Sequence, residues 1–250
     1  MRVLVSRSLI KTSLTKAVTA GYVVESSTTM PGSNHAAVFD FDYTLADSSE
    51  GCVECVNFAL QEMGLARHPD ENICRTIGLS LKETFVRLAG DQDAARGAEF
   101  ARLFVQRADQ VMVDLTVMYD SAHSALATLH DSGLRLGIVS TKYRYRIEQV
   151  LERENLRSFF DVVIGGEDVK EHKPHPAGLL EALKRLECQP QSTVYVGDSV
   201  VDAEVAKRAA VPFVAVLSGV TPEDHFEAYE RIGTLNDVSE LPRLLALTIP

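Results

Sequence analysis

Two pairs of aspartates stand at the ends of short apolar runs, where their carboxylates could bind a cation. Asp40 and Asp42 follow the run 37–39, and Asp198 and Asp202 follow the run 193–196. Side chains two apart on an extended chain lean to one side, and side chains four apart share a helix face. Carboxylates this close share a proton or need a cation between them. Taken singly, each pair could also be an acidic turn or a helix cap.

Hydroxyl and ammonium groups follow two other apolar runs. Ser140 and Thr141 come directly after residues 134–139, and Lys173 stands in a proline-flanked loop before a predicted helix over 177–186. Such groups could bind the oxygens of an anion. We expect the neighbouring His172 and His175 to be exposed loop residues.

The elements that must position these side chains alternate along the chain. Five β-rich runs, each followed by polar or glycine residues and a helical stretch, predict an α/β fold with a doubly wound, Rossmann-like parallel sheet. Open sheets of this kind bind ligands at the carboxyl ends of their strands. If the first and fourth runs are neighbours, the aspartates converge, and oxygen ligands in that number favour Mg²⁺. The runs are 37–39, 134–139, 161–164, 193–196 and 212–217.

Nearly 95 residues separate the first two runs, and this stretch has helical patterns of its own. An apolar stripe runs from Phe100 to Met112, and Ser80 and Glu83 form a capping box. We therefore predict a small α-helical cap over 51–114, inserted after the first strand into a core of 35–50 and 115–250.

Composition limits the partners. The net charge of −10 and pI near 5.2 disfavour nucleic acid. The longest apolar run, 209–217, has nine residues, too few to span a membrane. Cys52 and Cys55 have helical spacing and are read as packing residues, which favours a reducing, cytoplasmic compartment. Residues 1–34 are basic and Ser-rich, so they form a poorly ordered extension, an organellar transit peptide, or the product of a start upstream of Met30.

The ordered set of motifs resembles the haloacid dehalogenase superfamily over residues 36–217. The set comprises D-x-D-x-T at 40–44, a strand-end Ser-Thr at 140–141, Lys173 before a proline, and G-D-x-x-x-D at 197–202. The helical insertion resembles that superfamily's first type of cap. The layout is most similar to the phosphoglycolate-phosphatase-like branch, and residues 77–83 resemble its cap recognition loop.

The resemblance implies a Mg²⁺-dependent phosphatase that acts on a small phosphorylated metabolite through an aspartyl-phosphate. Asp40 would be the nucleophile and Asp42 the general acid and base. Asp40, the Asp42 carbonyl and Asp198 would bind Mg²⁺, with support from Asp202. The phosphoryl group would be held by Thr44, Ser140, Thr141 and Lys173.

Several residues of this sequence differ from those typical of other branches of the superfamily, and these differences limit the activities to be expected. Asp42 disfavours dehalogenation, because the dehalogenases lack the second aspartate, and the phosphonatases replace it too. Ser48 and Cys52 replace residues typical of the phosphohexomutases. A pyrophosphatase and a sugar-phosphate phosphatase or mutase remain alternatives within the fold, and a catalytically silent binding protein is the alternative outside enzymes.

The substrate and the oligomeric state, monomer or homodimer, are not readable from the sequence. Arg75 and Lys82 flank the loop around Gly78 and could bind a substrate carboxylate. Exposed helix charges are the alternative interpretation of both residues.

Overall fold

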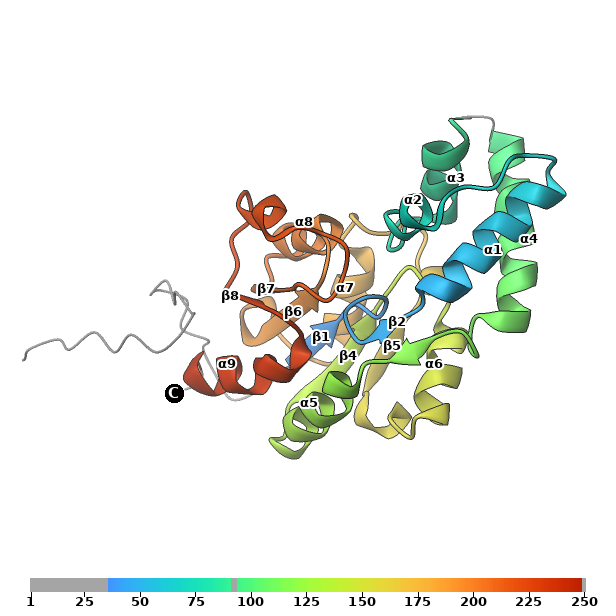
Figure 1. The fold of residues 1–250 in the computed structure, drawn as a ribbon. Coiled ribbons are helices and arrows are strands. Elements are labelled where there is room, and N and C mark those ends of the chain that lie inside the picture. Colours follow the sequence, from blue (N-terminus) through green and yellow to red (C-terminus); the bar gives the residue numbers. More distant parts are fainter. Residues whose placement is uncertain (1–35, 91–93, 249–250) are drawn as a thin grey trace, which may run out of the picture.

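The computed structural model describes residues 36–90 and 94–248. A sheet with helices on both faces forms one body, and a bundle of helices stands at one end of it (Figure 1). The basic segment 1–34, for which we predicted an extension or a transit peptide, lies outside the described residues.

The sheet has six parallel strands in the order β5-β4-β1-β6-β7-β8. It confirms the five predicted strands and places the first beside the fourth, with Phe39 opposite Val196. The sixth strand, at one edge, was not predicted, because its three residues form no apolar run. The strands are β1 (Ala36–Phe39), β4 (Arg135–Val139), β5 (Val162–Ile164), β6 (Thr193–Gly197), β7 (Phe213–Val216) and β8 (Gly233–Leu235).

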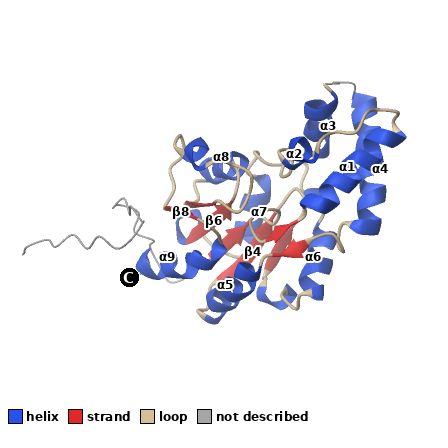
Figure 2. Cartoon of the chain, viewed as in Figure 1, coloured by secondary structure: helices blue, strands red, loops and turns tan. Residues whose placement is uncertain are grey.

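Each face of the sheet packs against its own helices (Figure 2). On β1, Ala37 and Phe39 join a cluster with α5 (Asp120–Asp131), α6 (Arg144–Arg153) and α9 (Leu241–Thr248). Ala36 and Val38 join the opposite cluster, with α7 (Ala177–Arg185) and α8 (Val200–Ala209). Alternate residues of a strand point to opposite faces, so a strand buried on both sides must be apolar throughout. The doubly wound class is confirmed.

The inserted helices form a third apolar cluster. They are α1 (Ser49–Glu62), α2 (Asp70–Cys74), α3 (Leu81–Ala89) and α4 (Ala94–Val111). The predicted stripe, which includes Phe100 and Met112, is buried in this cluster, and the predicted capping box at Ser80 opens α3. Cys52 and Cys55 are buried free thiols on α1, which confirms their packing role.

Two short strands join the helical body to the sheet. Ala46 of β2 (Ala46–Asp47) pairs antiparallel with Met118 of β3 (Val117–Met118). Five short 3₁₀ helices complete the secondary structure of residues 36–90 and 94–248: Arg157–Phe159, Gly166–Asp168, Pro190–Ser192, Glu223–Phe226 and Val238–Glu240. Within these residues, no helix combines the length and apolar character that a membrane crossing requires.

Candidate active site

Three buried carboxylates meet where β1 and β6 end. Asp40 follows β1, and its backbone N–H donates to the carbonyl of Val196 at 2.9 Å, which fixes it beside β6. Carboxylate oxygens of Asp40, Asp198 and Asp202 lie within 4.8 Å of one another. Thr44 is buried beside them and donates its hydroxyl to Asp198 Oδ1 at 3.3 Å. The predicted convergence of the two acidic motifs is therefore present.

Lys173 lies between two of these carboxylates. Its Nζ is 2.8 Å from Asp40 Oδ2 and 2.7 Å from Asp202 Oδ1. Burial disfavours its charge, but the carboxylates of Asp202 and Asp40 outweigh burial and hold the pKa of Lys173 well above its ordinary value. The loop before α7 thus places a positive charge beside Asp40, the predicted nucleophile.

Asp202 is committed to neighbouring protein groups. Its Oδ1 accepts from Lys173 Nζ and from the Tyr195 hydroxyl at 3.1 Å, and its Oδ2 accepts from the Ser199 hydroxyl at 2.5 Å. Ser199 and Asp202 form the capping box of α8. Sequence reasoning gave Asp202 a supporting role at a metal ion. These contacts orient Lys173. Asp40 is engaged as well, since its Oδ1 accepts from the Phe41 N–H at 2.7 Å and its Oδ2 contacts Lys173, and Asp198 accepts from the Thr44 hydroxyl.

Asp42 has two partners that sequence reasoning did not assign to the site. Its Oδ1 accepts from the Ser48 hydroxyl at 2.6 Å and lies 3.1 Å from Lys142 Nζ. Burial lowers the pKa of Lys142, but the negative charge of Asp42 raises it by more, so the pKa of Lys142 lies above its ordinary value. Lys142 directly follows the strand-end Ser-Thr pair. This position in the sequence could have identified it as a site residue.

The strand-end hydroxyls lie at β4, the other neighbour of β1. Ser140 is buried, and its Oγ accepts from the N–H of Lys142 at 3.3 Å. Thr141 reaches the helical body and donates its hydroxyl to the carbonyl of Gly78 at 3.3 Å. Gly78 has a φ of +92°, a left-handed conformation that favours glycine. The predicted recognition loop therefore touches the core.

Negative charge exceeds positive charge in this site. Burial raises the pKa of Asp40 to about 7 even though Lys173 lowers it, and burial with the Asp202 charge raises the pKa of Asp198 well above its ordinary value. The four aspartates of the motifs are buried with only two lysines, Lys142 and Lys173. Clustered oxygen donors whose ionisation is opposed by burial and by one another suit a hard divalent cation, which would favour their charged forms.

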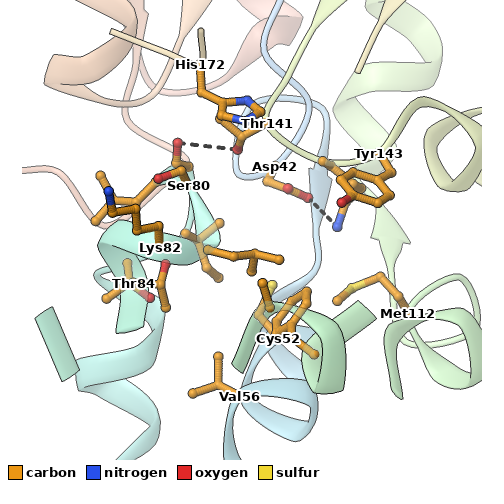
Figure 3. A pocket seen from close by; sticks show the side chains of 18 of the residues that line it. Asp42, Cys52, Val56, Ser80, Lys82, Thr84, Met112, Thr141, Tyr143 and His172 are labelled. Carbon is orange, nitrogen blue, oxygen red and sulfur yellow. Dashed lines mark hydrogen bonds and ion pairs between the residues drawn. The ribbon is translucent and has the colours of Figure 1, made fainter. Parts of the chain in front are cut away.

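A cavity of about 390 Å³ lies between the core and the helical body (Figure 3). Asp42, Thr141 and Lys142 line its core side, and Lys82 lies on α3. Arg75 does not line it, because its exposed guanidinium pairs with Glu71. The structure thus brings one of the two expected carboxylate-binding residues to the cavity and leaves the other outside.

The two histidines beside Lys173 differ in environment. His175 is partly exposed, with its Nε2 3.1 Å from a Glu171 oxygen. His172 was expected to be an exposed loop residue, and this expectation is wrong. It is half-buried and lines the cavity. No sequence signal distinguished it, because the loop path alone decides which histidine turns inward.

Fold and site define a hydrolase of the α/β class, and three comparisons identify its family. The profile of the family described as "Haloacid dehalogenase-like hydrolase" matches residues 37–216. The phosphoglycolate phosphatase of Salmonella typhimurium is 32% identical over 202 residues, which cover 72% of this chain and 80% of that protein. The pyrophosphatase PpaX of Bacillus mycoides is 30% identical over 212 residues, which cover 85% of this chain and 97% of that protein.

A crystal structure from Bacteroides fragilis, described as a haloacid dehalogenase-like hydrolase, superimposes with a TM-score of 0.81. It is 41% identical in sequence and covers 84% of this chain and 100% of its own. The chain belongs to the haloacid dehalogenase-like hydrolase family, in its phosphoglycolate-phosphatase-like branch, and is a phosphatase. The alternative of a silent binding protein is set aside.

Proposed function

We propose that this phosphatase hydrolyses a small phosphomonoester with Mg²⁺, through an aspartyl-phosphate formed on Asp40. The observation that carries the proposal is the buried contact of Asp40 with Lys173, 2.8 Å apart, beside Asp198 at the end of the central strand. Phosphoryl transfer needs alignment and neutralisation of charge on the phosphoryl oxygens more than covalent help. An anionic nucleophile beside a fixed ammonium and a cation site meets both needs.

Asp40, Asp198 and the carbonyl of Asp42 would hold Mg²⁺. The fit rests on the donor set described above: hard oxygen ligands whose negative charge Lys142 and Lys173 only partly balance. The bound ion would neutralise charge on the transferring phosphoryl group and offset the burial and the Asp202 charge that raise the pKa of Asp40.

The protein's own side chains supply the remaining steps. An Asp40 oxygen attacks phosphorus and the ester oxygen leaves. Asp42 protonates that oxygen and then takes a proton from the water that opens the aspartyl-phosphate. Ser48 holds Asp42 at 2.6 Å in the orientation from which it faces the cavity. Lys173 and Ser140 bind the phosphoryl oxygens, while Thr44 keeps Asp198 in place through its 3.3 Å hydrogen bond.

The relatives' names support two substrate classes, phosphoglycolate and pyrophosphate. Sequence reasoning favoured a phosphoglycolate-like monoester, acted on by a monomer or homodimer in the cytoplasm. Cys52, Cys55 and Cys74 are free thiols, which supports a reducing compartment.

The test is phosphate release from a panel of phosphomonoesters and pyrophosphate, with Mg²⁺ and with a chelator. We expect Mg²⁺-dependent turnover that Asp40→Asn removes, and phosphate trapped on the parent protein by rapid quenching. Full turnover in the chelator, or in a folded Asp40→Asn variant, would contradict the proposal.

A further inference from the structure

We infer that the leaving group is an alcohol with an apolar body and one polar substituent, rather than glycolate, phosphate or a sugar. The inference rests on the proposed function, because the cavity beside Asp42 is where that reaction places the leaving group. Its volume of about 390 Å³ falls within the range of about 300–1,000 Å³ typical of pockets for small organic molecules. Glycolate, with two carbons, would leave most of it unfilled.

Apolar side chains form most of the cavity wall on the side of the helical body. They come from α1, from the loop before α3, from α3 itself, and from α4 and the residue that follows it, so the apolar surface covers the helical side of the space and faces the polar core side. An apolar wall gains free energy only when it displaces water with an apolar group, at about 25 cal/mol per Å². The residues are Val56, Ile77, Leu79, Leu81, Phe104 and Met112.

Most positive charge in the cavity is already paired. Lys142 is 3.1 Å from Asp42, and Arg146 is 2.6 Å from Asp109 with its guanidinium 5.1 Å from the ring centres of two tyrosines. Lys82 is exposed. A phosphate leaving group carries several negative charges and would need cations or N–H groups turned toward it. The wall offers few, which disfavours pyrophosphate.

Three of the hydroxyl groups that line the cavity already donate to the protein. Thr76 donates to the carbonyl of Ile73 at 2.7 Å, Ser80 donates to Glu83 at 2.6 Å, and Thr141 donates to Gly78. A sugar would bury several hydroxyls, each costing about 1–3 kcal/mol when left without a partner. The remaining hydroxyls of the wall, those of Thr84 and Tyr143, are fewer than the hydroxyls of a sugar, which disfavours a sugar as the leaving group.

One polar atom at the cavity has no partner within the protein. His172 lines the space, and among the described residues its Nδ1 is buried without a hydrogen bond. Figure 3 shows the His172 ring next to Thr141. A Cβ added to Gly166 would lie 2.4 Å from the Thr141 carbonyl oxygen and 3.5 Å from His172 Cε1, so the ring and the Thr141 backbone border the same small space. In this ring orientation Nδ1 is closed to the cavity. Rotation of the imidazole about its Cβ–Cγ bond would turn Nδ1 toward the cavity, where a polar substituent of the leaving group would supply the missing hydrogen bond.

The first experiment measures kcat/KM of the parent enzyme with Mg²⁺. The panel is phenyl phosphate, 1-naphthyl phosphate, the hydroxyphenyl phosphates, phosphoglycolate, glucose 6-phosphate and pyrophosphate. We expect the aryl phosphates to exceed the last three at least about tenfold, and one hydroxyphenyl isomer to exceed phenyl phosphate about threefold to tenfold through one hydrogen bond. Replacing the imidazole by His172→Phe should bring that last ratio to about one.

The second experiment places a cation on the wall. Leu79→Lys should raise kcat/KM for phosphoglycolate relative to phenyl phosphate by about tenfold, the value of a charge-assisted hydrogen bond. The matched control is Leu180→Lys, which adds the same charge at an exposed leucine of α7 outside the cavity. The control should leave the ratio unchanged.

Each failure has its own signature. Highest activity on phosphoglycolate, glucose 6-phosphate or pyrophosphate, still dependent on Asp40, would overturn the leaving-group inference and leave the proposed function standing. No Asp40-dependent hydrolysis of any ester would overturn the proposed function itself. A ratio that moves equally in Leu79→Lys and Leu180→Lys would show that net charge, not the cavity wall, selects the substrate.

Discussion

The two halves of the active site are built by opposite means. On the core side, Asp40, Asp42 and Lys173 are buried to within 2–6% exposure and bind one another or neighbouring side chains. On the cap side, Ile77 and Leu79 are half-buried loop residues that present apolar surface to an open cavity. Moving a charge in the first half disturbs every charge around it, whereas a side chain in the second half can change alone. We therefore propose that the sheet fixes the chemistry and that the inserted helices set the specificity.

The largest effect should come from the nucleophile. Asp40→Asn should lower kcat by about 10⁴-fold or more, as loss of a nucleophile does elsewhere. The metal-free variant should nevertheless melt higher than the parent at pH 8. Folding raises the pKa of Asp40 from 3.8 to about 7, so the free energy of unfolding of the parent falls as pH rises from about 4 to 7. Asparagine does not ionise, so the variant does not lose this stability.

The measurement is thermal unfolding in a chelator between pH 4 and pH 8. The difference in melting temperature between variant and parent should grow up to about pH 7 and then level off. A variant that melts lower than the parent at every pH would mean that Asp40 stabilises the metal-free core, and would contradict this prediction.

The next effect concerns the general acid and base. Asp42→Asn should lower kcat by about 10²–10⁴-fold with little change in KM. Ser48→Ala removes the 2.6 Å hydrogen bond that orients Asp42 and a weaker 3.7 Å contact with Cys52 Sγ, so its effect should be about tenfold. Steady-state kinetics on phenyl phosphate would measure both. A Ser48→Ala loss as large as that of Asp42→Asn would make Ser48 part of the chemistry itself.

Metal binding should stabilise the protein measurably. Mg²⁺ at a hundred times its Kd should add about 2.7 kcal/mol to the free energy of unfolding. Asp198→Asn should weaken Mg²⁺ binding and activity together, and titration calorimetry would give the Kd. The matched control is Asp161→Asn. Asp161 accepts from the Leu136 N–H at 2.9 Å near the amino end of β4, the end opposite the site. Equal Mg²⁺ affinity in Asp198→Asn and the parent would place the ion elsewhere.

The smallest effects should distinguish Arg75 and Lys82, the two basic side chains that flank the loop around Gly78. Arg75 pairs with Glu71 outside the cavity, so Arg75→Ala should leave kcat/KM within about twofold for every substrate. Lys82 lines the cavity but is exposed, so Lys82→Ala should cost about threefold on phosphoglycolate. A larger loss from Arg75→Ala would return the carboxylate-recognition role to it and weaken the assignment of an apolar leaving group.

Local patterns in the sequence determined most of the framework. The Asp40 and Asp198 motifs lie directly after apolar strands, and the rule that parallel strands end at one edge brings them together. The capping box at Ser80 and the stripe through Phe100 are visible because helical periodicity is a property of neighbours in the chain. These features need no knowledge of tertiary contacts, which is why their prediction succeeded.

Tertiary structure alone decided how the polar side chains pair. Lys173 and Asp202 are 29 residues apart in the sequence. They meet at 2.7 Å because the parallel strands β5 and β6, which precede them, have their carboxyl ends on the same side of the sheet. In the same way Lys142 reaches Asp42 across from the neighbouring strand, and His172 turns into the cavity while His175 does not. Side-chain types in a sequence state which bonds are possible. Which of them form depends on distances that only the folded chain sets.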